Sequence, residues 1–254
     1  MSWADKKLNI LWLWPDVLNL HGDRGNVMAL VRVCGLYGID ARVTRVNRLK
    51  DMFWLDPVDI VMLGPGELAV MPQIVGALSK KYADFENYTE NGGVLFATGT
   101  TGAALGTETI RVDGSRIQGL GLLGMECRER KAVIGDDLIF RTSEDTTVYG
   151  LQIQMMSVEL AEGQEPFGRK VYGYGNNGGP AEGAVKSGVI FTNALGPVLV
   201  KNPWLTLNLI RKALARKSPV LPQDALRFDR ALFGLELASA KAIQAFNDTK
   251  ERPK

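Results

Sequence analysis

The sequence is poor in the side chains that most often carry chemistry. Its 254 residues include a single histidine, His21, and two cysteines, Cys34 and Cys127. Zinc sites of the usual kinds need several cysteine and histidine ligands at short spacings, and this chain supplies no such set. The low cysteine count favours a reduced, cytoplasmic protein. We expect neither a bound metal nor a cofactor.

Charge of one sign and long apolar runs are also missing. The chain carries 30 lysine and arginine residues against 28 aspartate and glutamate residues, a formal net charge of +2. Such a balance gives no electrostatic footprint for nucleic acid or a membrane surface. The apolar run 8–14 is too short for a membrane span, and it ends at Pro15 without the cleavage pattern of a signal peptide. We therefore expect no nucleic-acid partner and no membrane insertion.

Short apolar runs alternate with helical spacing in the first half of the chain. The predicted strands are 8–14, 41–46, 58–63 and 93–98. The runs 8–14 and 58–63 are typical of strands buried on both faces, whereas 41–46 alternates between apolar and polar residues. Helical spacing follows at about 27–34 and again from the turn after 58–63 to near Tyr88. This alternation predicts an α/β fold with a mostly parallel sheet, and ligands bound beyond the carboxyl ends of its strands.

Helical periodicity fades in the second half. Between about 110 and 200 we predict strands at 148–160 and 189–193, joined by glycine-rich turns within the same domain. Helical spacing returns over 224–247, after a linker at 217–219. We assign 1–216 to one α/β domain and 217–254 to a linker and helix packed on that domain. The sequence contains no internal repeat or low-complexity segment.

Three stretches resemble a known family. They are 14–26 (WPDVLNLHGDRGN), 173–184 (GYGNNGGPAEGA) and 196–203 (GPVLVKNP). In this order they are similar to the GatD family of CobB/CobQ-type glutamine amidotransferase subunits, and the likeness covers nearly the whole chain. The resemblance implies a flavodoxin-like, three-layer class I glutamine amidotransferase domain. It also implies a partner, an ATP-dependent, Mur-ligase-like subunit of the MurT type that receives ammonia and amidates a peptidoglycan precursor.

The residues for glutamine hydrolysis are missing. Class I domains use a thiolate at a sharp strand-to-helix turn and a histidine that moves its proton. By the resemblance, the nucleophile position is Gly99 and the histidine position is Leu195, directly before Gly196. Neither glycine nor leucine has a group that attacks a carboxamide or transfers a proton. No histidine follows His21, so a shifted alignment cannot restore the base.

Other positions complete a predicted degenerate pocket. The turn Gly64-Pro65-Gly66 resembles the family's oxyanion loop, which holds negative charge through backbone N–H groups. Pro65 has no N–H to donate, and a plain strand-to-helix turn is the alternative interpretation. Thr100 follows the nucleophile position. Arg128 matches an arginine to which the resemblance gives a role in glutamine binding, although it is equally typical of an ordinary exposed strand.

The cysteines offer a weak alternative nucleophile. Cys34 lies at apolar helical spacing, which is typical of a buried small hydrophobe. Cys127 lies close to two arginines that can lower a thiol pKa, but an ordinary cysteine on a charged strand is the simpler interpretation. The segment 151–154 (LQIQ) stands where the family has Phe-Glu-Asn-His, a further departure on the substrate side.

Polar residues within the resembling stretches predict a second role. They are Asp16, Asn19, Asp23 and Asn26 in the first stretch, and Asn176, Asn177 and Glu182 in the second. They serve either to dock a partner or to hold backbone geometry, since asparagine accepts left-handed backbone angles and bonds locally.

Three hypotheses follow for function. The first is a catalytically inactive, amidotransferase-like subunit that binds a Mur-ligase-like enzyme. The second is an active amidotransferase subunit that uses other residues, and the third is a sensor that binds a small molecule in the old glutamine pocket. A co-purifying ligase favours the first hypothesis, and ammonia release from glutamine favours the second.

Overall fold

A six-stranded sheet forms the centre of this computed structural model, which describes residues 6–217 and 226–250. The strand order is β11-β12-β4-β3-β1-β2, and β11 alone pairs antiparallel. The strands are β1 (Lys7–Leu13), β2 (Asp40–Val46), β3 (Ile60–Leu63), β4 (Val94–Thr98), β11 (Ala184–Lys186) and β12 (Val189–Thr192). All four strands predicted in the first half, and the one predicted at 189–193, belong to this sheet.

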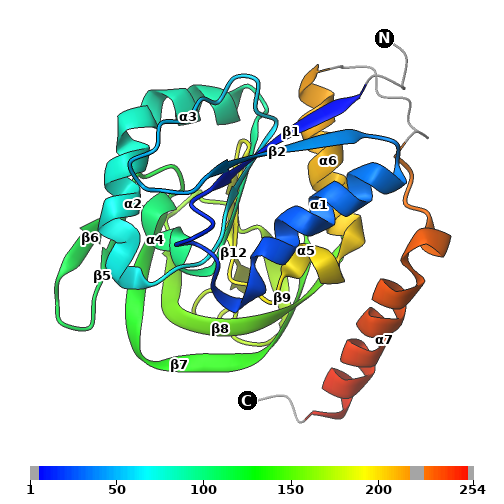
Figure 1. Cartoon of the computed structure of the whole chain (residues 1–254). Helices are drawn as coiled ribbons and strands as arrows, with labels where there is room; N and C mark the ends of the chain where they lie inside the picture. Colours follow the sequence, from blue (N-terminus) through cyan, green and yellow to red (C-terminus); the bar gives the residue numbers. More distant parts are fainter. Residues whose placement is uncertain (1–5, 218–225, 251–254) are drawn as a thin grey trace.

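Side chains of the central strands alternate between two apolar layers. Leu11 and Leu13 of β1 pack in one layer, while Ile10 and Trp12 pack in the other. Helices cover both layers, as Figure 1 shows. They are α2 (Met71–Leu78), α3 (Tyr82–Glu90) and α4 (Gly102–Leu105) on the first face, and α1 (Arg24–Leu36), α5 (Val198–Lys201) and α6 (Pro203–Lys217) on the second. The predicted α/β fold with a mostly parallel, doubly covered sheet is confirmed.

A second sheet packs beside the first and is mostly antiparallel. Its order is β10-β9-β7-β5-β6, and β8 pairs with β7 in a long hairpin. The strands are β5 (Glu108–Ile110), β6 (Arg116–Gln118), β7 (Met125–Thr142), β8 (Thr147–Leu160), β9 (Gly168–Tyr172) and β10 (Ala181–Glu182). Strand β8 matches the strand predicted at 148–160. An isolated bridge between Leu151 and Leu195 joins the hairpin to the segment after β12, so the hairpin reaches the carboxyl edge of the central sheet.

The terminal helix begins later than its sequence pattern predicts. We predicted helix over 224–247, but residues 226–229 are not helical; a 3-10 turn spans Arg230–Phe233 and α7 spans Gly234–Thr249. The side chain of Asp229 accepts a hydrogen bond from the Ala231 N–H at 2.9 Å, which caps this start. Residues 224 and 225, and the predicted linker residues 218 and 219, lie outside the described residues.

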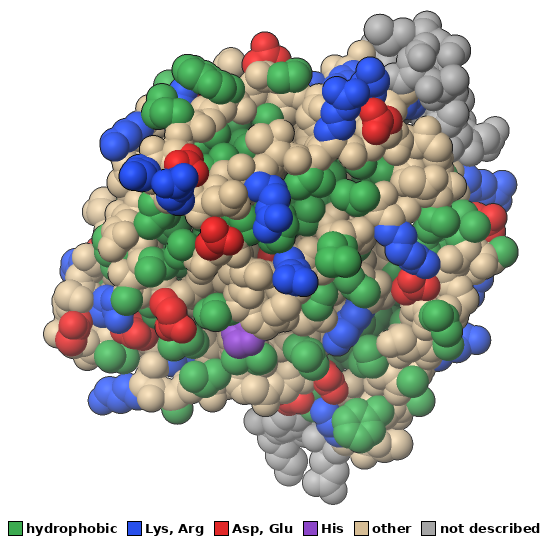
Figure 2. Space-filling view, in the orientation of Figure 1, with side chains coloured by type: hydrophobic (Ala, Val, Ile, Leu, Met, Phe, Trp, Pro, Cys, Tyr) green, Lys and Arg blue, Asp and Glu red, His purple; other side chains and the backbone are tan. Residues whose placement is uncertain are grey.

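The remaining short elements are 3-10 turns at Leu20–Gly22, Leu68–Val70, Ser79–Lys81 and Gly99–Thr101. Figure 2 shows acidic and basic side chains interspersed over the visible face, consistent with the near balance of charge. Among the described residues, each helix is too short or too polar to cross a membrane.

Candidate functional site

The chain turns sharply where β4 ends, and we call the turn Thr98–Thr101 the elbow. Gly99 has a φ of +60°, a left-handed conformation that costs an L-residue about 1–2 kcal/mol and costs glycine little. The 3-10 turn and α4 follow at once, so the elbow leads from strand to helix at the carboxyl edge of the sheet. The backbone therefore presents residue 99 as a nucleophile would be presented, but without a side chain.

Leu195 occupies the space in front of Gly99. A Cβ atom built on Gly99 would lie 3.1 Å from Cδ2 of Leu195 and 3.1 Å from Cβ of Pro65. Leu195 is 3% exposed, and its backbone N–H donates to the Leu151 carbonyl at 2.7 Å while its carbonyl accepts from the Leu151 N–H at 3.1 Å. The structure thus brings together the predicted nucleophile position, base position and glycine turn, and joins them by apolar contact.

The turn Gly64–Glu67, which we call the glycine loop, faces the elbow through Thr100. The Gly66 N–H donates to Oγ1 of Thr100 at 2.9 Å, and the same hydroxyl donates to the Gly66 carbonyl at 2.6 Å. An oxyanion hole needs N–H groups that are directed at the substrate oxygen. Here the Gly66 N–H is bonded within the chain, so the loop offers one donor fewer to a ligand.

Little space remains beside the elbow. Gly99, Thr100, Gln154, Met156 and Asn193 line a cavity with Ile153 and Met155, and its volume is about 10 Å³. One water molecule needs roughly 10–15 Å³ by this measure. In this conformation the cavity therefore has room for about one water molecule at most.

Five buried polar side chains, two of which line this cavity, form a bonded cluster that we call the polar frame. They are Gln152, Gln154, Asn176, Glu182 and Asn193. The Asn193 amide donates to Asn176 and to Glu182, each at 2.9 Å. Glu182 also accepts from the Thr192 hydroxyl at 2.6 Å and from the Asn193 N–H at 2.9 Å.

The glutamines tie the frame to the 173–184 stretch. Gln152 donates to Gln154 and to the Gly175 carbonyl, and Gln154 donates to the Asn176 carbonyl at 3.2 Å. Asn176 in turn brackets Gly183, whose carbonyl and N–H it meets at 2.9 and 2.7 Å. Burial raises the pKa of Glu182 despite its donors, since no cation is among its bonded partners. The frame is a bonded scaffold for the loops around the cavity.

Asp23 and Asn26 form a second buried polar cluster on the other side of the elbow. Asp23 accepts from the Thr98 hydroxyl and from the Asn26 amide, both at 2.8 Å. Asn26 accepts from the Leu199 N–H at 2.8 Å, which ties α1 to α5. Burial raises the pKa of Asp23 to about 6, and its two hydrogen bonds oppose that rise. A Cβ on Gly64 would lie 2.5 Å from the Asp23 carboxylate, so this cluster requires glycine at 64.

The predicted docking or structural residues fall into two groups by exposure. Asp23, Asn26, Asn176 and Glu182 are buried and bonded internally, so their side chains are not available to a partner. Asp16 and Asn177 are exposed, and Asn19 is half-buried. Asn177 donates to Glu159 at 2.8 Å, and Asn19 accepts from the Arg24 N–H at 2.9 Å.

Arg128 lies apart from the elbow. Its side chain is 57% exposed and its guanidinium pairs with Glu126 at 2.8 Å, and Arg128 is absent from the lining of the cavity at Gly99. The neighbouring Arg130 instead packs its guanidinium 4.8 Å from the centre of the Tyr174 ring and donates to the Tyr174 hydroxyl at 2.9 Å. In this conformation no arginine lines the small cavity.

Both cysteines are buried and lie outside the cavity at the elbow. Burial raises the pKa of each thiol to about 12, which leaves almost no thiolate at neutral pH. Within residues 6–217 and 226–250, no cluster of histidine, cysteine, aspartate or glutamate has the makings of a metal site. The described residues thus offer the site no thiolate and no metal.

Two features of the site were not predicted from the sequence. Asn193 joins Asn176 to Glu182, and Thr100 bonds the glycine loop through its hydroxyl. The signal for Asn193 is its place directly after the apolar run 189–192, at the carboxyl end of a parallel strand. The Thr100 hydrogen bonds left no sequence signal, because they depend on how two distant loops meet.

Known proteins resemble the chain along most of its length. It is 33% identical over 218 residues to the lipid II isoglutaminyl synthase (glutamine-hydrolyzing) subunit GatD of Streptococcus pneumoniae, covering 83% of this chain and 82% of that protein. It is 28% identical over 226 residues to the subunit of the same name from Staphylococcus aureus, covering 86% and 89%. A search of protein-family models gave no match.

Solved structures resemble the chain in fold. A crystal structure of a glutamine amidotransferase aligns with a TM-score of 0.54 at 17% identity, over 80% of this chain and 98% of that one. PurLQS from Thermotoga maritima aligns with a TM-score of 0.53 at 12% identity, over 84% and 100%. At these identities the likeness concerns the fold alone.

Proposed function

Because the chain belongs to the GatD family of lipid II isoglutaminyl synthase subunits, we propose that it is a member that no longer hydrolyses glutamine. It acts instead as the non-catalytic partner of an ATP-dependent, Mur-ligase-like subunit of the MurT type. The nitrogen for that partner's reaction comes from free ammonia or another amine, and the product belongs to cell-wall precursor modification.

One observation carries the proposal, namely the apolar contact of Leu195 with Gly99. A covalent mechanism needs a nucleophile at this turn and a base within hydrogen-bond reach of it. Gly99 supplies no nucleophile, and Leu195 fills the adjoining space with methyl groups that cannot accept a proton. The short bonds between Thr100 and Gly66 add a third obstacle, because they use a backbone donor of the glycine loop.

The two rival functions have less support. An active amidotransferase needs another thiolate, and the pKa of both cysteine thiols is raised to about 12 by burial. A sensor in the old glutamine pocket needs space for its ligand, and the cavity beside Gly99 measures about 10 Å³. Neither rival is favoured by a specific feature of the site.

Ammonia release from glutamine tests the loss of hydrolysis. The purified chain is incubated with glutamine, with the Streptococcus pneumoniae GatD subunit as positive control, and ammonia is measured against a buffer blank. We expect no release above the blank, with or without the partner ligase. Turnover that disappears in a Cys127→Ser variant would support the active rival and refute the proposal.

Restoring the two missing groups tests the assignment of positions. Gly99→Cys alone supplies a thiol, and we expect it to release no ammonia because Leu195 still occupies the place of the base. Gly99→Cys with Leu195→His supplies both groups, and a positioned base contributes about 10²–10⁴-fold. The matched control is Gly99→Cys with Leu195→Asn, which opens the same space without a base. Efficient turnover by the single variant would show that the Leu195 assignment is wrong.

Purification from the native cell tests the partner. A tagged chain is expected to carry with it a Mur-ligase-like, ATP-dependent protein in a fixed ratio. The complex is then given either ammonium or glutamine as nitrogen source, and we expect amidation of the precursor with ammonium only. A chain that purifies without such a protein would refute the partner role, whereas equal use of glutamine would refute the loss of hydrolysis.

A further inference from the structure

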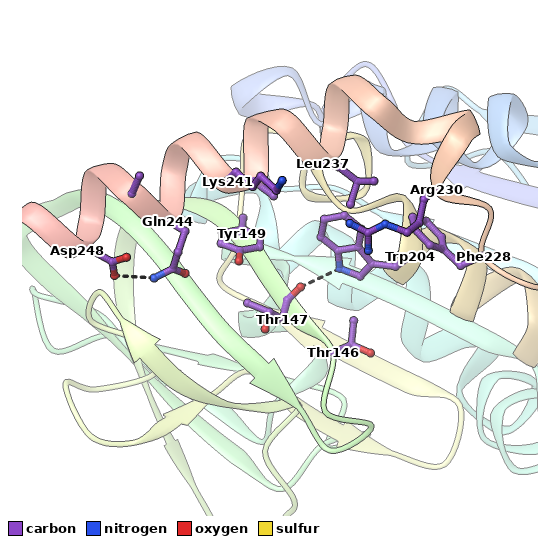
Figure 3. Close-up of a pocket in the computed structure, with 12 residues that line it drawn as sticks. Thr146, Thr147, Tyr149, Trp204, Phe228, Arg230, Leu237, Lys241, Gln244 and Asp248 are labelled. Atoms are coloured by element: carbon purple, nitrogen blue, oxygen red, sulfur yellow. Dashed lines mark hydrogen bonds between the residues drawn. The ribbon is translucent and has the colours of Figure 1, made fainter.

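A second cavity lies between α7 and the body of the protein, and no residue of the elbow lines it. Its volume is about 630 Å³, and it shares no lining residue with the cavity at Gly99. Cavities that bind small molecules commonly measure about 300–1,000 Å³. Figure 3 shows α7 along one side and the start of β8 with the first turn of α6 on the other.

The body side of the cavity is an aromatic wall. The ring of Trp204 meets Tyr149 edge-on at 6.4 Å and Phe228 edge-on at 6.1 Å between centroids. Phe228 stacks on the buried Phe233 at 5.1 Å. The Trp204 indole N–H donates to the Thr147 carbonyl at 2.8 Å, which fixes the plane of the largest ring. The wall is therefore ordered by contacts within the chain before any ligand enters.

Helix α7 forms one side of the cavity, which is open to solvent, and does not fill it. Ala240 and Ala245 line the cavity with Leu237, so two short side chains face the aromatic wall where larger ones would close the gap. Ala240 and Asn247 are the buried residues of this 16-residue helix. With so few buried residues, α7 does not pack into the core along its length, and it leaves space between itself and the body of the protein.

Two cations line the same cavity. Arg230 and Lys241 are both exposed, and neither has an ion-pair partner in the part of the chain that the structure describes. The acid in the lining, Asp248, accepts a hydrogen bond from Gln244 at 2.7 Å. The lining thus holds two cations against one acid, a small positive balance, and both cations are exposed to a ligand.

We propose that this cavity binds a small aromatic anion, a flat ring that carries a carboxylate, phosphate or sulfonate group. The ring packs against Trp204 and Phe228 under α7, and the acidic group pairs with Arg230 and Lys241. A neutral aromatic molecule makes only the first set of contacts, and a simple inorganic anion makes only the second. The site is independent of the proposed loss of glutamine hydrolysis, since it uses other residues.

Fluorescent probes test both halves of this recognition. The probe 8-anilinonaphthalene-1-sulfonate carries a sulfonate on a flat naphthalene ring, and N-phenyl-1-naphthylamine is its uncharged analogue. Titration of the full chain is expected to show one site for the sulfonate, confirmed by calorimetric stoichiometry. Arg230→Gln with Lys241→Gln should weaken the sulfonate about threefold to tenfold and leave the neutral analogue unchanged, because exposed ion pairs contribute modestly. Lys50→Gln with Lys80→Gln removes two exposed cations elsewhere and is expected to change neither probe.

A second variant tests the cavity itself. Ala245 is exposed, so Ala245→Trp can place a large ring in the cavity without disturbing the core. We expect both probes to bind at least about tenfold more weakly to this variant, with an unchanged melting temperature. The proposal is overturned if Arg230→Gln with Lys241→Gln binds the sulfonate as tightly as the native chain, or if Ala245→Trp leaves both affinities intact.

Discussion

The elbow and the polar frame border the same small cavity, yet their side chains are of opposite kinds. At the elbow, Gly99, Leu195 and Pro65 meet through apolar contacts and leave no group that moves a proton. In the frame, five buried polar side chains bond one another and the surrounding backbone. Buried polar groups are costly unless they are bonded, so the frame needs all its partners, whereas the contacts among Gly99, Leu195 and Pro65 need none. The frame therefore has the character of a bonded scaffold, and the contacts of Gly99 have the character of apolar packing.

The largest expected effect is the loss of Glu182. Glu182→Ala removes the acceptor of the Thr192 hydroxyl, the Asn193 N–H and one Asn193 amide hydrogen, and leaves these three donors buried without that acceptor. We expect the free energy of unfolding to fall by about 3–5 kcal/mol, because each buried donor left unsatisfied costs about 1–3 kcal/mol. Urea unfolding measures the change.

Asn177→Ala is the matched control in the same stretch. Asn177 is exposed, so its replacement should stay within about 0.5 kcal/mol of the native chain. A small effect of Glu182→Ala, similar to that of Asn177→Ala, would contradict the scaffold role of the frame.

The pH dependence of stability tests Asp23, which bonds the elbow at Thr98. Its pKa is about 6 in the folded chain, above the value of about 3.9 that an unfolded aspartate has. Between these pH values the folded state holds a proton on Asp23 that the unfolded state has released. The contribution of Asp23 to the free energy of unfolding is therefore complete below pH 4 and is lost as pH rises through 6. The loss amounts to about 3 kcal/mol.

Comparison with Asp23→Asn isolates that contribution. The variant cannot ionise at this position, so the difference in unfolding free energy between native and variant should change across pH 4–6. Denaturant titrations at half-unit pH steps measure it. A difference that stays constant with pH would contradict the raised pKa.

Thr100 joins the elbow to the glycine loop, so its loss should have a middle-sized effect. Thr100→Val keeps the shape but leaves the Gly66 N–H and carbonyl without their short bonds. We expect a destabilisation of about 2 kcal/mol. Thr44→Val, on the exposed edge strand β2, is the control and should change stability little. Equal effects of the two variants would show that the bonds of Thr100 add nothing.

The smallest expected effect concerns the left-handed turn. Gly99→Ala should lower stability by about 1 kcal/mol, because a Cβ is strained at this φ and lies close to Leu195. Gly76→Ala, in the middle of α2 with open space around it, should raise stability by up to about 1 kcal/mol. Thermal unfolding of the two variants gives opposite shifts if this is correct. A stabilising Gly99→Ala would contradict the strain.

The central strands of the parallel sheet, β1, β3 and β4, were predictable because they are buried on both faces. Apolar runs such as 8–14 and 93–98 carry that burial directly in the sequence. Strand β7 was not predicted, since Arg128, Lys131 and Asp137 interrupt its apolar alternation along an exposed hairpin. Helix α6 was missed for the opposite reason. It is buried on most sides, so it lacks the amphipathic spacing by which surface helices are found.

The candidate site was predictable only in part. The resemblance gave Gly99 and Leu195, and the absence of any later histidine made the missing base independent of alignment. The apolar contact between them, the Thr100 bonds and the closure of the cavity depend on three segments that meet only in the folded chain. Whether Asn176 or Asn177 faces inward also follows from the fold, since adjacent asparagines look alike in a sequence.

The φ of Gly99 affects which substitutions at this turn are accessible during evolution. A side chain at this turn adds strain of about 1–2 kcal/mol. Under the proposed function, a nucleophile at 99 restores no activity while residue 195 is leucine. A histidine at 195 is equally useless while residue 99 has no side chain. Each single step back toward hydrolysis is therefore neutral or harmful, and the benefit arrives only with both. With glycine at 99 and leucine at 195, recovery of glutamine hydrolysis would therefore need two substitutions together, whereas its loss needs only one.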